Sequence, residues 1–138
     1  MSKGTARKLL SGLMGLALAI AWADGALADH RKGHVDVRVP ALSEMAAFGQ
    51  TAFNETCAKC HGENGAGTEK GPPLIHQIYN PGHHSDQSIY NAMRNGVRQH
   101  HWPYGDMPKQ AVGFYASSAI VKFIREMQHA NDIQYQQH

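Results

Sequence analysis

The sequence predicts an all-α domain in which three or four short helices are joined by long loops. Three segments of the chain space their apolar residues as one face of a helix does. The stretches between them are rich in glycine, proline and polar residues, which is typical of loops. The one strand-like pattern alternates Val35, Val37 and Val39, but it ends at Pro40 and has no partner strand. Loops of this length are expected in a small domain when a group at its centre organises them.

The first helix is expected to run from an N-cap at Ser43 to about Cys57. Phe53 is the anchor of its apolar face. A short central helix is expected after Ser85, and it ends at Gly96, where a C-terminal glycine cap is common. The expected inner faces are Ala46, Ala47, Gln50, Phe53 and Asn54 on the first helix, and Ile89, Tyr90, Met93 and Val97 on the central one.

The last helix is expected to begin near Ser117 or Ser118 and to stop near Asn131. Met45 and Met93 are interpreted as core filler, since an isolated methionine usually packs in a core. Core packing is also the favoured role for the methionine of the last helix. The apolar face of that helix consists of Ile120, Val121, Ile124 and Met127, with Phe123 beside it.

Residues 1–28 have the composition of a secretory signal peptide. Basic residues come first, an apolar core follows over residues 9–23, and a small-x-small site precedes Asp29. The competing interpretation is an uncleaved anchor helix, but the apolar run is interrupted and short for a membrane span. The predicted location is therefore the bacterial periplasm, with membrane contact only through an uncleaved anchor or a membrane-bound partner.

After the signal peptide the chain divides into a polar tail, residues 29–43, and one small domain, residues 44–138. Of the 13 basic and 11 acidic residues, three basic and one acidic lie in residues 1–28, so ten of each remain. This neutral balance gives no support to nucleic-acid binding. All 10 histidines lie after the signal peptide, so the charge of the mature chain responds to mildly acidic pH.

The motif Cys57-Ala58-Lys59-Cys60-His61 uses both cysteines of the chain. C-x-x-C-H is the signature of covalent c-type haem attachment, in which each thiol adds to one vinyl group. His61 is then placed as an axial ligand of the iron. A thioredoxin-like dithiol is disfavoured because no βαβ pattern surrounds it, and a zinc site is disfavoured because no second C-x-x-C exists. A chance match in a loop is the remaining alternative.

Met107 is the preferred candidate for the second axial ligand. Pro108 holds it in an extended stretch, and methionine–histidine ligation raises the potential relative to two histidines. Histidines are the competing ligands, or sites for an adventitious metal. Solvated surface positions are expected for the first pair of adjacent histidines. For the second pair, a position at the haem edge or a hydrogen bond to a propionate is the less favoured alternative to a surface position. These competitors are His76, His83, His84, His100 and His101.

From Ala47 onward the chain resembles the class I c-type cytochromes, in particular the single-haem, methionine-ligated bacterial ones. The shared pattern starts with Gly49 and Phe53 ahead of the C-x-x-C-H motif. It continues with a glycine-rich turn and then a set of short motifs. These are Gly71-Pro72-Pro73-Leu74, Asn95-Gly96-Val97 and Gly105-Asp106-Met107-Pro108.

The resemblance implies a small cytochrome c fold wrapped around one covalently attached haem c with its iron. It implies that Gly49 lets the first helix cross closely over the last one, against Phe123. It also implies that the Pro72 carbonyl receives the Nδ1 proton of His61. The segment Ile78–Ser88 and the tail before Pro40 depart from the minimal pattern, and either is a candidate docking surface for a partner.

The expected function is that of an exported electron carrier that shuttles single electrons between redox partners in the bacterial cell envelope. Both axial positions are expected to be filled, so the protein is not expected to be an enzyme. Expected partners are a dehydrogenase, an oxidase or another electron carrier. The alternatives are a dedicated haem subunit of a larger dehydrogenase or terminal oxidase, and a haem sensor or peroxidase with a labile distal ligand.

Overall fold

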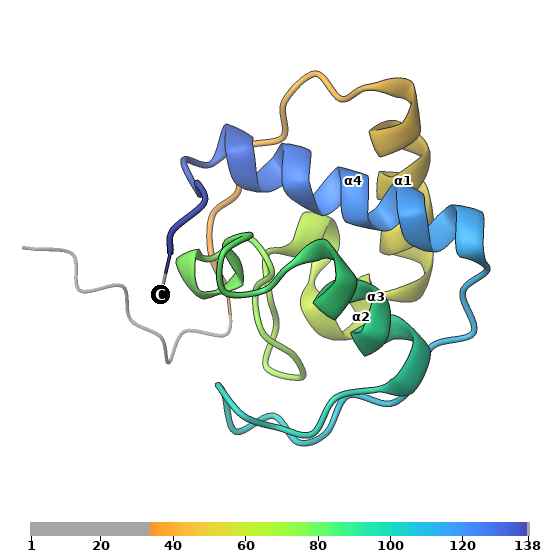
Figure 1. The fold of residues 1–138 in the computed structure, drawn as a ribbon, viewed down its shortest axis with the longest axis vertical. Helices are drawn as coiled ribbons and strands as arrows, with labels where there is room; N and C mark the ends of the chain where they lie inside the picture. Colours follow the sequence, from red (N-terminus) through yellow and green to blue (C-terminus); the bar gives the residue numbers. More distant parts are fainter. Residues whose placement is uncertain (1–33, 138) are drawn as a thin grey trace, which may run out of the picture.

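The computed structural model describes residues 34–137, so the expected signal peptide, residues 1–28, lies outside it. The described residues form the expected all-α fold (Figure 1). No strand occurs among them, and two isolated backbone bridges are the only β-type pairings there. The α-helices are α1 (Glu44–Thr56), α2 (Ala58–His61), α3 (Asp86–Asn95) and α4 (Phe114–Ala130), and short 3-10 helices lie at η1 (Glu63–Gly65) and η2 (Gln77–Tyr79).

Side-chain caps set the ends of α1 and α3 where the sequence predicts them. The hydroxyl of Ser43 accepts a hydrogen bond from the backbone N–H of Ala46, and α1 follows directly. Ser85 caps α3 in the same way, and α3 ends at Gly96, whose φ of 79° suits glycine. Asn131 ends α4, as expected. These four predictions are confirmed.

The predicted start of α4 is wrong by about one turn. The helix begins at Phe114 rather than near Ser117, and the N-cap residue Gly113 has no side chain to offer. The hydroxyls of Ser117 and Ser118 donate to the carbonyls of Val112 and Phe114 instead of capping a helix. A helix start without a side-chain cap has no local sequence pattern that marks it. Ser117 and Ser118 have the residue type of an N-cap but lie inside the helix.

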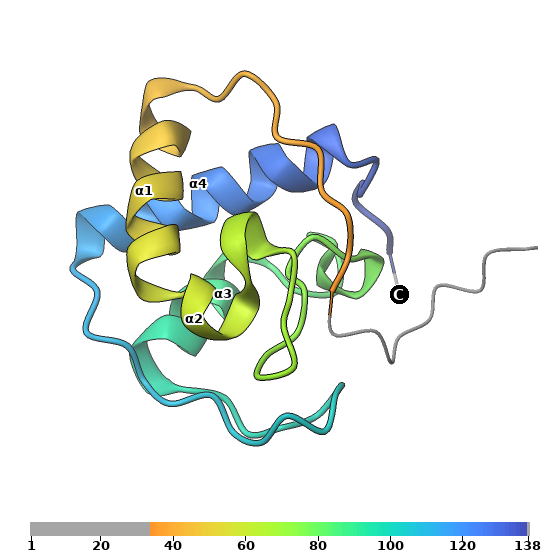
Figure 2. The same cartoon turned by 180° about the vertical axis from the view of Figure 1, so that it is seen from behind.

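The packing of α1 across α4 forms the centre of the core (Figures 1 and 2). A Cβ placed on Gly49 would lie 1.9 Å from the carbonyl oxygen of Ala119, so only glycine permits this approach. One turn further on, the rings of Phe53 and Phe123 meet with their centroids 5.5 Å apart. The expected role of Gly49, and its partner Phe123, are therefore confirmed.

The apolar face predicted for α4 is buried, and Met127 has no exposed surface. Met93 is also buried, whereas Met45 is 36% exposed, so its assignment as core filler is wrong. Ala47, predicted on the inner face of α1, is exposed as well. Helical periodicity predicts which face of a helix is apolar, but not how much of that face a neighbouring helix will bury. The buried residues of α1 are Ala46, Gly49 and Phe53.

The described part of the tail, residues 34–43, lies against the domain without forming a strand. The N–H of Val35 donates to the carbonyl of Ala66. Arg38 contacts the end of α4, where its backbone N–H and carbonyl both bond to the side chain of Asn131. Backbone groups of an extended segment are therefore satisfied by loops and helix ends rather than by a neighbouring strand.

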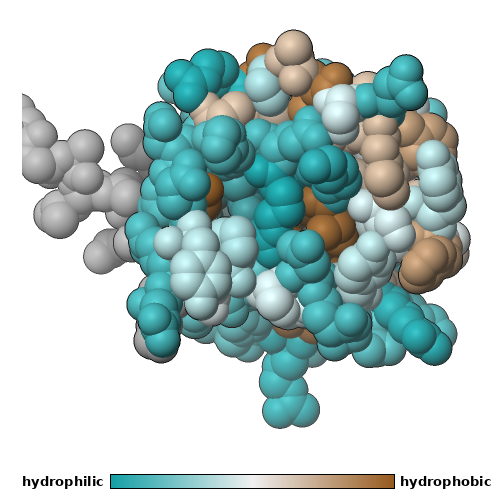
Figure 3. All heavy atoms as spheres, turned by 45° about the horizontal axis from the view of Figure 1, so that its top comes forward, coloured by the Kyte–Doolittle hydropathy of each residue, from teal (hydrophilic) through white to brown (hydrophobic). Residues whose placement is uncertain are grey.

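The surface of the described residues is mostly hydrophilic. Figure 3 shows apolar residues gathered toward one side, over α1 and the start of α4. The large exposed side chains there are Phe48, Phe114 and Tyr115, and the rings of Phe48 and Tyr115 are in contact. Among residues 34–137, no helix combines the length and the apolar character that crossing a bilayer requires.

Candidate functional site

The short helix α2 carries Cys60 and His61, and Cys57 is its N-cap. Cys57 also ends α1, so the chain passes from one helix into the next at the first thiol. The carbonyl of Cys57 accepts hydrogen bonds from the N–H groups of Cys60 (3.0 Å) and His61 (2.9 Å). One helical turn thus holds both thiols and the imidazole in a fixed relation. The sequence predicted the motif but not this separate helix.

His61 is buried and oriented by the backbone. Its Nδ1 lies 2.9 Å from the carbonyl oxygen of Pro72. A carbonyl can only accept, so Nδ1 carries the proton and Nε2 keeps its lone pair. Burial lowers the pKa of His61, and the hydrogen bond to Pro72 opposes this effect only in part. The imidazole is therefore neutral at pH 7, which is the form that binds iron.

The two thiols lie in different environments. Cys57 is buried, and burial raises its thiol pKa to about 11, while Lys59 acts in the opposite direction. Cys60 is half-buried, and neither cysteine is in a disulfide. Both sulfurs are thus reduced, as addition to vinyl groups requires.

The glycine-rich loop after His61 is folded back tightly under α2. Gly62 has a φ of 73°, and a Cβ there would lie 2.4 Å from the carbonyl oxygen of Gly67. Asn64 fixes the loop to α1: its side-chain oxygen accepts from Gln50 (2.8 Å), and its N–H donates to Asn54 (2.9 Å). The polar residues on α1 that the sequence placed on its inner face therefore anchor the loop rather than the core.

Met107 is held by the backbone opposite the end of α3. Val97 and Met107 exchange both N–H···O hydrogen bonds, each 2.9 Å long, as an isolated antiparallel bridge. The two chain segments that meet there run side by side in both ribbon views (Figures 1 and 2). A Cβ on Gly96 would lie 2.6 Å from the carbonyl oxygen of Met107, so glycine is needed for this pairing.

A largely apolar cavity of about 370 Å³ brings these parts of the chain together. Cys57, His61, Pro72 and Met107 all line it, although they come from three separate segments. A smaller cavity of about 110 Å³ shares these four residues and adds Cys60. Together the two neighbouring cavities have two thiols, an imidazole and a thioether at their walls, a set that fits a porphyrin with iron at its centre.

Histidines of the predicted competitor group also line the large cavity: His84, His100 and His101 do so, whereas His76 and His83 do not. The expectation of a solvated surface position is therefore wrong for His84, which is half-buried. The segment Ile78–Ser88 folds over the cavity instead of away from it. His76 caps η2, where its Nδ1 accepts from the N–H of Ile78 (3.2 Å).

The wall of the cavity includes two aromatic residues that the sequence did not single out. Trp102 is 8% exposed, and its ring stacks on Tyr79 with centroids 5.7 Å apart and planes 14° from parallel. His76 meets the edge of Trp102. A tryptophan in a polar, proline-broken loop is a detectable signal, because such a large ring rarely remains in solvent.

Arg125 and Gln128 of α4 fix the segment that carries these groups. Arg125 donates to Asp86 (2.6 Å), to the carbonyl of Tyr79 (3.0 Å) and to the carbonyl of His84. Gln128, 1% exposed, donates to the carbonyls of Leu74 and Tyr79. Arg125 and Gln128 lie next to the apolar residues of α4, and polar side chains at such positions are the sequence pattern that could have indicated this network.

Comparison with known proteins agrees with this geometry. The family model for cytochrome c matches residues 46–128. A search of curated proteins finds no match. Among solved structures, the chain is similar to the crystal structure of the c-type cytochrome XoxG from Methylobacterium extorquens AM1, with a TM-score of 0.52 and 18% identity. That match covers 70% of this chain and 60% of XoxG.

The family match spans more than half of the chain and includes the C-x-x-C-H motif, α3 and the Met107 loop. The structural match independently supports the fold. The chain therefore belongs to the cytochrome c family, and its prosthetic group is a covalent haem c with iron.

Proposed function

We propose that this c-type cytochrome is an exported single-haem electron carrier, with His61 and Met107 as axial ligands and Cys57 and Cys60 as the thioether residues. The observation that carries the proposal is the single cavity lined by Cys57, His61 and Met107, with Cys60 at its smaller neighbour. When bound, haem c supplies a one-electron couple at its iron.

The residues of the chain have separate tasks in this scheme. His61 offers Nε2, because Pro72 holds the proton on Nδ1 and thereby fixes the tautomer. Met107 offers a thioether from a segment whose backbone is tied to Val97. Both side chains are held by backbone hydrogen bonds, so they would move little between oxidation states of a bound haem, which would favour rapid electron transfer. If both hold the iron, no substrate site would remain there.

Redox protein partners follow from this function, and weak, transient docking is expected for an electron carrier. The proposed address is the bacterial periplasm, reached through residues 1–28. The test is the mass of the protein purified from the periplasm: cleavage before Asp29 supports the proposal, and an intact N-terminus in the membrane fraction supports an anchored form.

Replacing Met107 with Ala tests the ligand assignment. The ferric protein should lose its methionine-to-iron charge-transfer band, the midpoint potential should fall, and the iron should bind carbon monoxide or cyanide. Met45→Ala, which removes an exposed methionine, is the matched control and should leave the spectrum unchanged. Unchanged spectra in Met107→Ala would exclude Met107 and direct attention to His84, His100 and His101.

The wild-type protein itself separates an electron carrier from a haem sensor or peroxidase. A carrier with two strong axial ligands should bind carbon monoxide poorly at pH 7. Rapid binding by the wild type would contradict the proposal and favour a labile distal ligand.

A further inference from the structure

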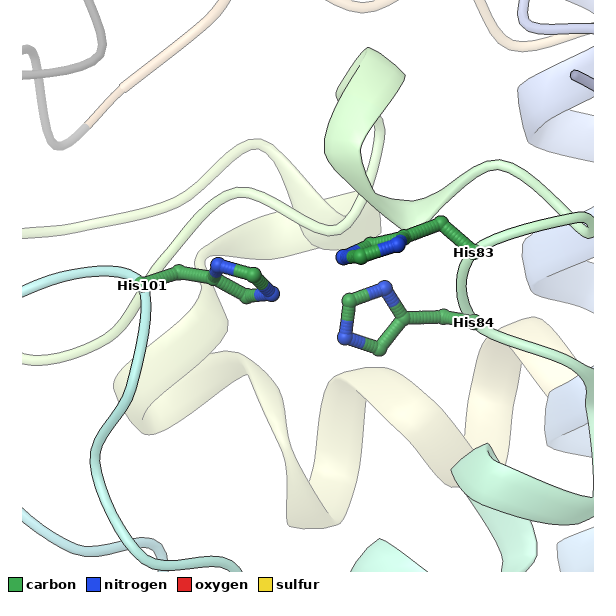
Figure 4. Close-up of side chains that lie close together, drawn as sticks. All are labelled: His83, His84 and His101. Carbon is green, nitrogen blue, oxygen red and sulfur yellow. The ribbon is translucent and has the colours of Figure 1, made fainter. Parts of the chain in front are cut away.

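Three histidines from two separate loops meet beside the haem cavity. Figure 4 shows the imidazole of His101 facing those of His83 and His84. One ring nitrogen from each residue lies within 4.8 Å of the other two. Ring centroids are separated by 4.6 Å for His83 and His84, 5.3 Å for His83 and His101, and 5.1 Å for His84 and His101.

The backbone under His83 and His84 is held in place by buried polar groups. The side-chain oxygen of Asn80, a residue only 1% exposed, accepts from the N–H groups of Gly82 (2.9 Å) and His83 (3.2 Å). Arg125 donates to the carbonyl of His84. The backbone of the histidine pair is thus fixed before any ligand arrives, whereas the rings can still rotate.

His84 has the orientation that metal-binding histidines usually have. Its Nδ1 lies 2.8 Å from the carbonyl oxygen of Ile78, which makes Nδ1 the donor and leaves the lone pair on Nε2. Metal ligands of this type almost always give their other ring proton to a carbonyl or carboxylate. Arg125 places a positive charge near His84, and Asp86 balances this charge: its Oδ1 lies 2.6 Å from Nε of Arg125.

His101 has a buried ring nitrogen with no partner. Its Nε2 is the one buried side-chain nitrogen or oxygen atom without a hydrogen bond among residues 34–137. Leaving such an atom unsatisfied costs free energy, which a ligand would recover.

We propose that His83, His84 and His101 form a binding site for a divalent transition metal, Cu²⁺ or Zn²⁺, separate from the haem iron. Imidazole nitrogen suits both ions, with bond lengths of about 2.0–2.1 Å. Those bond lengths in a tetrahedral site place ligand nitrogens about 3.4 Å apart. The three ring nitrogens lie within 4.8 Å of one another, so small side-chain rotations, such as that of the exposed His83, would bring them to this spacing, and a water molecule would complete a tetrahedral set.

Calorimetric titration of the haem-loaded protein with Zn²⁺, and separately with Cu²⁺, tests the site. We expect one tight equivalent for the wild type. His83→Ala and His101→Ala should each weaken it at least about tenfold, since loss of an outer partner alone costs about 10- to 100-fold. His129→Ala, which removes an exposed histidine on α4, is the matched control and should not change the affinity.

Electron paramagnetic resonance of bound Cu²⁺ gives a second readout, because each coordinated imidazole nitrogen splits the signal and each variant should remove one. Haem absorption spectra and thermal unfolding without added metal show that the variants fold. If the wild type does not bind metal, or binds it no better than His83→Ala and His101→Ala, the proposal is wrong. A His101→Ala variant that shifts the haem spectrum while the wild type takes up no metal would assign the histidines to the haem edge instead.

Discussion

Gly96 and Gly105 both have a positive φ angle but lie in different surroundings. Their φ angles are 79° and 85°. A Cβ on Gly96 would lie 2.6 Å from the carbonyl oxygen of Met107, whereas a Cβ on Gly105 would meet nothing within 4 Å. The two positions therefore separate the cost of backbone strain from the cost of displacing the Met107 segment.

Alanine at Gly96 should cost more than alanine at Gly105. Both variants place a residue with a Cβ at a positive φ, which costs on the order of 1–3 kcal/mol. Only Gly96→Ala also pushes the Met107 backbone away, which adds about 1–3 kcal/mol and weakens the methionine-to-iron band. Denaturant unfolding and ferric spectra of the two variants measure both effects. Equal losses of stability and identical spectra would contradict the argument.

Glu126 links the start of α1 to α4 in a pH-dependent way. Burial raises the pKa of its carboxyl, but hydrogen bonds from the N–H and hydroxyl of Ser43, together with Lys122, outweigh burial, and the pKa is lowered from 4.5. A lowered pKa in the folded state means that the unfolded state binds the proton more readily. The stabilisation is therefore present above pH 4.5 and is lost as the pH falls through the folded-state pKa.

Glu126→Gln should remove about 1 kcal/mol of stability at pH 7 and nothing at pH values below both pKa values. Urea unfolding between pH 3 and pH 7 measures the difference from the wild type. Glu55→Gln, which removes an exposed carboxylate on α1, is the control. A difference between Glu126→Gln and the wild type that stays constant with pH would rule out this linkage.

At the scale of helices, the α1–α4 crossing depends on one missing side chain. Gly49→Ala would place a Cβ 1.9 Å from the Ala119 carbonyl oxygen, so the helices must separate. The variant should lose about 3 kcal/mol or more, whereas Ala47→Gly, at an exposed position of α1, should lose about 1 kcal/mol. Thermal unfolding of the haem-loaded proteins checks this. A Gly49→Ala variant as stable as the wild type would disprove the close-packing argument.

Helix ends were predictable where one side chain sets them. Ser43, Ser85 and Gly96 act within a few residues of their own position, so the sequence contains the whole signal. The start of α4 has no such residue and was missed. Exposure of Met45 and Ala47 was missed because it depends on where a distant helix lies, not on the spacing within α1.

For the site, the motif around His61 could be predicted because it is contiguous, and Met107 was chosen because Pro108 holds it in an extended stretch, in agreement with the family pattern. The meeting of His84 with His101 could not be predicted. It depends on Arg125, far along the chain, which holds the carbonyls of Tyr79 and His84. Contacts that join two loops through a distant helix follow no repeating residue spacing, so the sequence pattern does not reveal them.

At the scale of the whole molecule, the domain is built around its cofactor. Loops from several parts of the chain meet at the wall of the 370 Å³ cavity, and a chain this small buries a limited core. We therefore expect covalent haem to contribute to folding.

Removing the attachment residues should reveal this dependence. In the Cys57→Ser, Cys60→Ser double variant, acidified organic solvent should extract the haem, whereas the wild type should retain it. Once haem-free, the variant should keep part of its helical circular dichroism but lose its aromatic signal, because α1 and α4 still pack while the loops lose their support. Native-like aromatic signal in the haem-free form would show that the fold does not need the cofactor.

Because the backbones of Val97 and Met107 are paired, the position of Met107, the proposed ligand, does not depend on the length of the loop between them. Their two hydrogen bonds join the two ends of the loop formed by residues 98–106. The tip of this loop, which includes His100 and His101, takes no part in that backbone pairing. Doubling the length of such a loop costs only about 0.6 kcal/mol of closure entropy. Insertions at the tip can therefore alter what the protein touches at its edge while the distance from α3 to Met107 stays the same, which makes this loop a place where new specificity can be added without redesigning the metal centre.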